Sequence, residues 1–208
     1  KYKIVYKDLE KAIQCKKYQV GDFLLTEQEL VETFKVSRDT IRKALSLLVE
    51  EGLVKKIHGA GSQVISQEQV NFPVSDLTSY QELIEQQGLK SQTNIISLDK
   101  IIVDIILSEK TGFSRSQQVW CLIRQRIVDG CASVVDIDYL DVRLMPQLNR
   151  IIAENSIYDY LENQLHLSIS HAFKEITIDN TSEQDKILID IGKDHNVVCI
   201  RSKVYLNN

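Results

Sequence analysis

Proline and glycine are scarce in this sequence, with two and eight residues among 208. Such scarcity argues against a disordered or fibrous chain, because those classes are rich in one or both residues. No run approaches the roughly 18 consecutive apolar residues of a membrane-spanning helix, and the N-terminal residues lack the apolar core of a signal peptide. The sequence therefore favours a globular, cytoplasmic protein.

Clustered ligand residues are also missing. The four cysteines lie far apart, without a C-x-x-C pair or a histidine pair at zinc-finger spacing. His166, His171 and His195 are scattered, which is typical of surface or packed histidines. No nucleophile lies at a recognisable spacing from a base. The sequence therefore predicts no metal site, no cofactor and no catalytic residue.

Charge is distributed unevenly along the chain. Residues 1–67 contain 12 Lys and Arg against 9 Asp and Glu, a net charge of +3, whereas residues 68–208 contain 13 against 20, a net charge of −7. A mildly basic N-terminus on an acidic remainder is typical of a nucleic-acid contact confined to the N-terminal part.

Residues 37–52 are predicted to form an amphipathic helix between the N-cap Ser37 and the terminating Gly52. The apolar residues recur at helical spacing: Ile41, Ala44, Leu45, Leu48 and Val49. The opposite face begins with residues suited to the major groove of DNA: Arg38, Thr40, Arg42 and Lys43. Taken alone, a solvated helix with a few basic residues has the same pattern.

The neighbouring segments favour DNA binding. Residues 3–17 have the apolar stripe of a first helix, and Thr26 with Glu29 forms the capping box of a second. Residues 53–57 and 63–65 are predicted strands around a glycine-containing turn, which Lys55, Lys56 and His58 make basic. Three helices followed by a basic hairpin form a winged helix-turn-helix.

Residues 4–65 resemble the DNA-binding domain of GntR-type bacterial transcription regulators. The matching segments are residues 24–27, 36–45, 52–54 and 59–61, with Leu25 and Ala60 as departures from the family pattern. The resemblance implies double-stranded operator DNA as a partner. Together with the basic hairpin and the helix start, it assigns the DNA contacts to Glu27, Ser37, Arg38, Thr40, Arg42, Lys43, His58, Gly59 and Gly61.

The remaining chain is predicted to be an antiparallel α+β domain over residues 76–208, after a linker at 67–75 and the DNA-binding domain at 1–66. Helices are predicted at residues 76–87, 104–112, 146–153, 156–165 and 182–191. Strands are predicted at residues 93–103, 119–128, 132–140, 171–179 and 197–206.

Two arginines fall on an otherwise apolar strand face. Alternation along residues 119–128 places Arg124 and Arg126 in line with Trp120 and Leu122. A buried arginine pair requires an anion, either protein carboxylates or a phosphate ligand. A strict two-residue turn at 129–130 would pair Arg124 with Val135, whereas a three-residue turn with a bulge would pair it with Asp136. We favour the second turn.

Residues 76–208 resemble the effector-binding domain of the HutC-like branch of the GntR family, which has a chorismate-lyase-like fold. The resemblance implies an effector site made of Thr78, Ser79, Arg124, Arg126, Asp136, Ser156 and Tyr158. Residues 72–80 and 134–140 are most similar to trehalose operon repressors of that branch, which implies trehalose-6-phosphate as the effector. The family pattern continues with one more strand beyond Asn208.

We therefore expect a homodimeric repressor of a sugar-utilisation operon that a sugar phosphate releases from its operator. Three alternatives remain open. The effector can be another phosphosugar, such as N-acetylglucosamine-6-phosphate, or a metabolite without phosphate, which would leave the arginine pair without a role. The domain at 76–208 can also be an enzyme that acts on a small anionic metabolite, since its expected fold is shared with a lyase.

Overall fold

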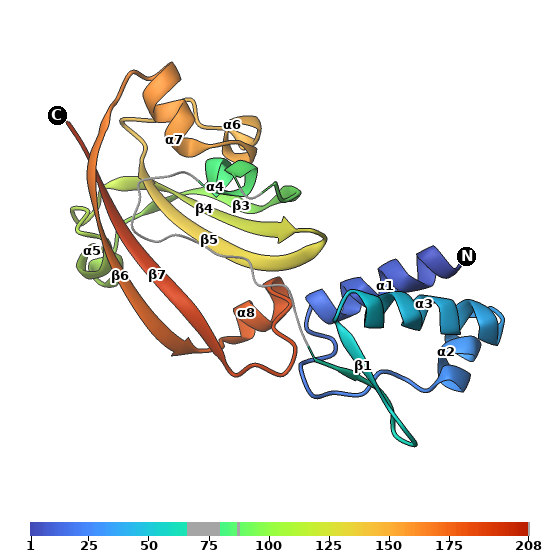
Figure 1. Cartoon of the computed structure of the whole chain (residues 1–208). Coiled ribbons are helices and arrows are strands. Elements are labelled where there is room, and N and C mark those ends of the chain that lie inside the picture. Colours follow the sequence, from blue (N-terminus) through green and yellow to red (C-terminus); the bar gives the residue numbers. More distant parts are fainter. Residues whose placement is uncertain (66–79, 87, 208) are drawn as a thin grey trace. The chain divides into compact units, whose positions relative to one another are not determined.

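The computed structural model describes residues 1–65, 80–86 and 88–207. The predicted linker at 67–75 and the first residues of the predicted helix 76–87 lie outside the described residues. The chain divides into two compact units, residues 1–71 with 190–194 and residues 72–189 with 195–208 (Figure 1). Within the described parts of the chain, no helix is long and apolar enough to cross a membrane.

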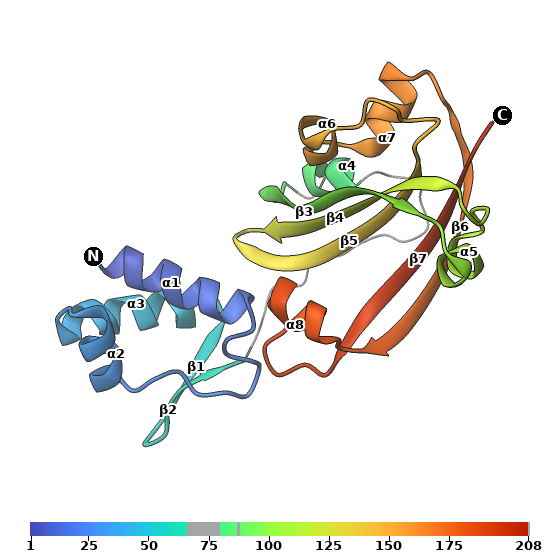
Figure 2. The ribbon, with the colours of Figure 1, turned by 180° about the vertical axis from the view of Figure 1, so that it is seen from behind.

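Residues 1–65, which we call the head, form three helices and a hairpin. The helices are α1 (Tyr2–Gln14), α2 (Glu27–Phe34) and α3 (Arg38–Glu50), and the antiparallel strands are β1 (Val54–Ile57) and β2 (Gly61–Val64). Figure 2 shows α1 and α3 side by side, and the two helices pack against each other. The predicted winged helix-turn-helix is present.

Local hydrogen bonds determine where α2 and α3 begin. The Thr26 hydroxyl accepts the Glu29 N–H at 3.3 Å, and the Glu29 carboxylate accepts the Thr26 N–H at 2.7 Å. This is the predicted capping box, which satisfies two otherwise unpaired backbone donors. The Ser37 hydroxyl accepts the Thr40 N–H at 3.4 Å and caps α3, as predicted.

Apolar residues from all three helices and both strands form the core of the head. Leu30, Ile41, Leu45 and Leu48 are almost fully buried, and Val54 and Val64 of the hairpin join them. Val49 is 38% exposed, so its predicted place on the buried face is wrong. It lies at the margin of the apolar stripe, where the helix surface turns toward solvent.

Residues 80–189 and 195–207, which we call the body, contain a three-stranded sheet in the order β3-β4-β5. The strands are antiparallel: β3 (Ser91–Ile102), β4 (Gln118–Val128) and β5 (Cys131–Asp141). Helix α4 (Tyr80–Gln86) precedes the sheet, and α5 (Ile105–Thr111) lies between β3 and β4.

Three short helices follow the sheet in the chain: α6 (Arg150–Glu154), α7 (Ile157–Asp159) and the π-helix η1 (Tyr160–Gln164). They pack their apolar residues on Trp120 and Leu122 of β4, and the Trp120 indole donates to the Met145 carbonyl at 2.9 Å. Figures 1 and 2 show α6 and α7 on one face of the sheet. The predicted helix 146–153 is too long, because its first residues form turns before Asn149 caps α6.

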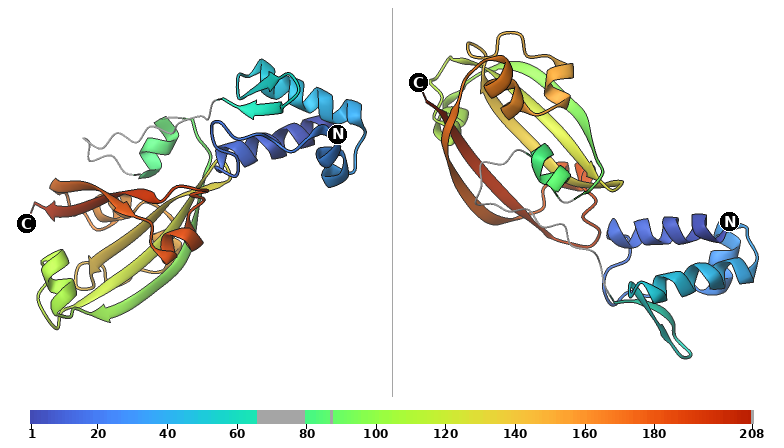
Figure 3. Two further views of the ribbon diagram at one scale, coloured as in Figure 1. Left: turned by 90° about the horizontal axis from the view of Figure 1, so that it is seen from below. Right: turned by 45° about the horizontal axis from the view of Figure 1, so that its top comes forward.

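A long hairpin completes the body. Strands β6 (Ile169–Asn180) and β7 (Asn196–Leu206) pair antiparallel, and Figure 3 shows them side by side along their length. Helix α8 (Glu183–Leu188) lies between them in the chain and is shorter than the predicted helix 182–191. Ser182 caps α8 through a capping box with Asp185.

The connection between β4 and β5 decides which residues face the arginines. It is a two-residue turn, Asp129-Gly130, and both residues have positive φ, at 48° and 86°. The three-residue turn that we favoured is therefore wrong. Ser133 instead interrupts the register as a bulge inside β5. Because of this bulge, Arg124 faces Asp136, which is the pairing we predicted.

Candidate functional sites

The polar start of α3 is accessible in the head. Arg38, Arg42 and Lys43 are exposed, and Thr40 is partly exposed. The hydroxyl oxygens of Ser37 and Thr40 lie 3.0 Å apart, so the two side chains hydrogen-bond each other beside the helix N-terminus. Free backbone amides and cations at a helix N-terminus favour phosphate oxygens.

Glu27 connects α2 with α3 and the hairpin. Its carboxylate accepts the Arg42 Nε–H at 2.9 Å and lies 3.9 Å from the Lys56 ammonium nitrogen. The Arg42 side chain remains 59% exposed. Because Glu27 takes the Nε–H, the two terminal nitrogens of Arg42 are left as the outward donors of the guanidinium. Glu27 is therefore placed to orient Arg42.

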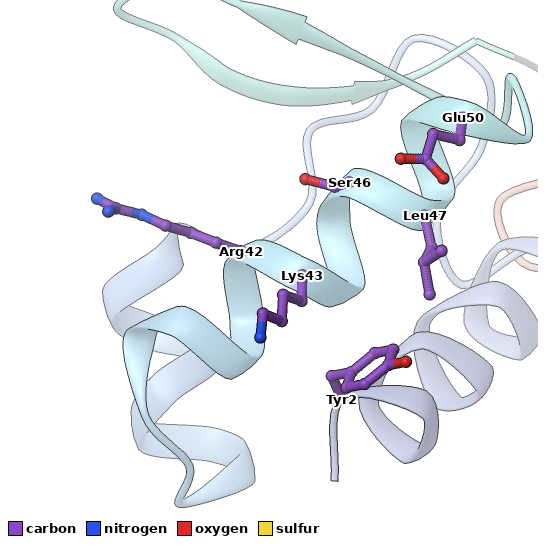
Figure 4. A pocket seen from close by; sticks show the side chains of 6 residues that line it. All are labelled: Tyr2, Arg42, Lys43, Ser46, Leu47 and Glu50. Carbon is purple, nitrogen blue, oxygen red and sulfur yellow. The ribbon is translucent and has the colours of Figure 1, made fainter.

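A hollow of about 380 Å³ lies between α1 and α3 of the head, and Figure 4 shows its lining. Its lining residues are Tyr2, Arg42, Lys43, Ser46, Leu47 and Glu50. Tyr2 and Leu47 form an apolar side, and the two cations lie along the same face of α3. The hollow therefore continues the basic surface at the start of α3.

The tip of the β1–β2 hairpin has the predicted glycine turn. Gly59 and Gly61 have φ values of +78° and +116°, which L-residues rarely adopt. His58 is exposed beside them, as are Lys55 and Lys56. The hairpin therefore presents cations and close backbone, the features by which a wing contacts a phosphate backbone.

In the body, Arg124 and Arg126 lie on the sheet face that α6 and α7 cover. Each residue is 5% exposed, and the residues at alternate positions of β4 are buried with them. The predicted buried arginine pair is therefore present. Burial of two guanidinium groups requires close anions, since an unpaired buried charge is strongly destabilising.

Two carboxylates of β5 supply these anions. Arg126 Nε donates to Asp136 Oδ2 at 2.8 Å, while Arg124 Nη2 donates to Asp138 Oδ2 at 2.7 Å and lies 3.5 Å from Asp136 Oδ2. Each arginine thus takes its shortest contact from the carboxylate diagonal to it, because Arg124 faces Asp136 and Arg126 faces Val134 in the strand register.

Other elements also hold the two arginines. Arg126 donates to the Thr93 hydroxyl at 2.6 Å, and its guanidinium carbon lies 4.5 Å from the centre of the Tyr80 ring. Arg124 Nη1 donates to the carbonyls of Ala153 and Asn155 at 3.2 and 3.4 Å. Arg124 therefore links β4 to the end of α6. Its Nε is buried without a hydrogen-bond partner among the described residues.

Ser156 and Tyr158, the later effector residues of our prediction, flank the same face. The Ser156 hydroxyl accepts the Asp159 N–H at 3.2 Å and caps α7. Burial raises the pKa of Tyr158, and the Asp138 carboxylate raises it further. Loss of water chiefly raises the pKa of Asp138 too, and the attraction of Arg124 only partly offsets this. The phenol and the carboxylate thus interact electrostatically.

Sequence reasoning missed Asp138, Thr93 and Tyr80 as members of this cluster. Asp138 lies two residues after Asp136 on the same strand face, so alternation alone could have identified it. Thr93 and Tyr80 come from other elements and required the tertiary fold. Thr78 and Ser79 lie outside the described residues.

A metal site is not formed by the described residues, which include no group of three or more His, Cys, Asp or Glu side chains that could hold an ion. The cluster instead combines two guanidinium groups, two carboxylates, a threonine hydroxyl and two phenols. Such groups can bind a phosphate and hydroxyl groups of one ligand.

Two family models match the chain: bacterial regulatory proteins of the gntR family over residues 1–64, and the UTRA domain over residues 86–208. The HTH-type transcriptional regulator TreR of Bacillus subtilis is 35% identical over 100% of this chain and 87% of its own length. The mannosyl-D-glycerate transport/metabolism system repressor MngR of Escherichia coli is 28% identical over 89% of this chain and 77% of its own length.

Among solved structures, the effector-binding domain of the B. subtilis trehalose repressor aligns with a TM-score of 0.52 and 31% identity. The alignment covers 55% of this chain and 80% of that domain. The matched families and relatives are transcription regulators and not enzymes. This finding removes the enzyme alternative.

Proposed function

The chain belongs to the GntR family of transcription regulators, with a UTRA effector domain, and we propose that it represses a sugar-utilisation operon until trehalose-6-phosphate releases it. GntR regulators bind operator DNA, and they bind small-molecule effectors through the UTRA domain. The observation that carries our proposal is the buried arginine pair, because two guanidinium groups on one strand face suit a phosphomonoester. Similarity to TreR over the full chain favours a trehalose derivative.

On this proposal α3 enters the major groove and the hairpin follows the phosphates. Arg38, Thr40, Arg42 and Lys43 project from the exposed start of α3, where side chains can reach base edges and backbone. Ser37, Glu27, His58, Gly59 and Gly61 complete the interface as positioning or phosphate contacts. Binding of this kind weakens steeply with added salt, because each phosphate contact releases counterions.

The effector site takes its phosphate from Arg124 and Arg126, with Ser156 and the predicted Thr78 and Ser79 as further donors. Asp136 accepts hydroxyl groups of the sugar, and Tyr158 closes the site from α7. A ligand that binds one arrangement of the protein more tightly shifts the population toward it. The operator-bound arrangement is then depleted.

We also propose that the protein acts as a homodimer in the cytoplasm. One face of the β6–β7 hairpin carries exposed apolar cross-strand pairs: Ile176 with Ile200, and Ile178 with Val198. These four side chains are 44–72% exposed, and exposed apolar patches of this kind mark association surfaces. Two-fold symmetry would place two α3 helices on the half-sites of a palindromic operator.

Thermal melting and DNA binding test the proposal together. An operator is first selected from random DNA with the full-length protein, and its affinity is then measured by fluorescence anisotropy with trehalose-6-phosphate, trehalose, glucose-6-phosphate or N-acetylglucosamine-6-phosphate. We expect trehalose-6-phosphate to raise the melting temperature and release the DNA, since a ligand of the native state stabilises it. Equal effects of trehalose and its phosphate would overturn the phosphate proposal.

A further inference from the structure

We propose that Asp138 is an internal counter-ion that the phosphate of the effector must displace from Arg124, and that it thereby restricts the site to phosphorylated sugars. This inference rests on the proposed function. It assigns a selective role to a residue for which the sequence predicted none.

The first argument is the charge of the cluster. Arg124 and Arg126 contribute two positive charges, and Asp136 and Asp138 contribute two negative charges through ion pairs of 2.7–3.5 Å. The described cluster is therefore neutral before a ligand arrives. A phosphomonoester carries about −1.5 to −2 charges at neutral pH, so it binds a neutral site well only if a carboxylate moves away or takes up a proton.

The second argument is the order in which a ligand meets these groups. The arginine side chains are each 6% exposed, whereas those of Asp136 and Asp138 are 26% and 34% exposed. A ligand from solvent thus meets carboxylates before it meets guanidinium groups. Weak anions and neutral sugars cannot compete with a carboxylate for an arginine, whereas a phosphate with three acceptor oxygens can.

Asp138 is the carboxylate that can leave with less loss. Asp136 lies close to both arginines, but Asp138 contacts Arg124 alone. When Asp138 moves, Arg124 keeps its bonds to the carbonyls of Ala153 and Asn155, so the guanidinium stays in place. Its Nη2 is then free, and its Nε also lacks a partner among the described residues.

A displaced Asp138 requires a new partner, either a sugar hydroxyl or a proton from solvent. The charged and titratable groups that face it among the described residues are Arg124 and Arg126 on β4, Asp136 on β5 and Tyr158 on α7. Burial and the nearby Asp136 already raise the pKa of Asp138. Without the full attraction of Arg124, protonation becomes easier still.

Calorimetric titration of the full-length protein tests this role. Trehalose-6-phosphate and trehalose are titrated into the wild type, Asp138→Asn and Asp99→Asn, in two buffers of different ionisation enthalpy. Asp99 is an exposed carboxylate on β3, opposite Cys121, and its substitution gives the same change in charge. Asp138→Ser serves as a second variant, and melting followed by Trp120 fluorescence confirms that each variant is folded.

We expect Asp138→Asn to bind trehalose-6-phosphate about tenfold more tightly than the wild type, because one charge-assisted competitor is lost. It should also take up fewer protons on binding, while Asp99→Asn matches the wild type. Unchanged or weaker binding of the phosphate by both Asp138 variants, with a wild type that binds it, overturns the role of Asp138 alone. A wild type that does not prefer the phosphate overturns the proposed effector and this inference together.

Discussion

Replacement of Arg124 by Met tests whether the arginine cluster holds the body together. The substitution keeps an apolar side chain of similar length but removes the partner of Asp138 and the donor to the Ala153 and Asn155 carbonyls. Removal of one member of a buried ion pair typically costs about 3–5 kcal/mol. We expect a loss of this size, since Arg124 is 5% exposed.

Urea unfolding followed by fluorescence provides the measurement. Trp120 is the only tryptophan of the chain, is 9% exposed and packs in the core of the body, so its emission reports on this unit alone. The free energy of unfolding falls by about 2 kcal/mol per M urea in small domains, so a loss of about 4 kcal/mol lowers the midpoint by about 2 M.

Arg143→Met is the matched control. Arg143 also pairs with an aspartate of β5, at 2.6 Å from Asp141, but its side chain is 76% exposed. Water screens such a pair, so we expect almost no change in the midpoint. An Arg124→Met midpoint equal to that of the wild type would refute our interpretation of the cluster. Asp138→Leu combined with Arg124→Met should recover part of the loss, because it removes the unpaired carboxylate.

Three further predictions concern the head. Leu45→Ala, at a position 1% exposed, should lower the free energy of unfolding by about 2–5 kcal/mol, measured by melting of helical circular dichroism; an unchanged melting temperature would contradict its place in the core. The Thr26 hydroxyl and N–H donate to Glu29 and lower its pKa, so the stability this carboxylate contributes is full above the ordinary glutamate pKa and is lost as the pH falls through the lowered one. Glu29→Gln should therefore weaken the acid dependence of melting, and the same dependence in the variant would disprove it. Arg42→Ala should weaken operator binding and reduce the salt slope by about one; Arg201→Ala, with the same change in charge on β7, should leave both unchanged.

Local sequence signals predicted most elements because short-range chemistry determines them. The capping box at Thr26, the cap at Ser37 and the alternation along β4 each depend on residues close in sequence. The errors lie where a tertiary contact or a backbone detail decides. The extra residue of the β4–β5 connection is Ser133 inside the strand, and nothing in the residue types distinguishes this bulge from a longer turn.

The candidate site was predicted only in part, for the same reason. Arg124 and Arg126 follow from alternation, and Asp136 follows from the register. The diagonal preference of Arg124 for Asp138 depends on how far the guanidinium reaches across the twisted sheet, which the pattern does not reveal. Tyr80 contacts Arg126 from a helix 40 or more positions away in the chain, by the roughly 4.5 Å contact typical of a cation on an aromatic face.

Both domains hold an arginine with a carboxylate, but burial gives the two pairs different consequences. Arg42 is 59% exposed beside Glu27, so water screens the pair and a DNA phosphate replaces the carboxylate at little cost. Arg124 is 6% exposed beside Asp138, so displacement requires a ligand that restores every lost contact. Added salt should therefore weaken DNA binding steeply while it changes phosphosugar binding much less. If effector affinity fell with salt as steeply as operator affinity, the phosphate would have to bind at an exposed surface and not at the buried pair.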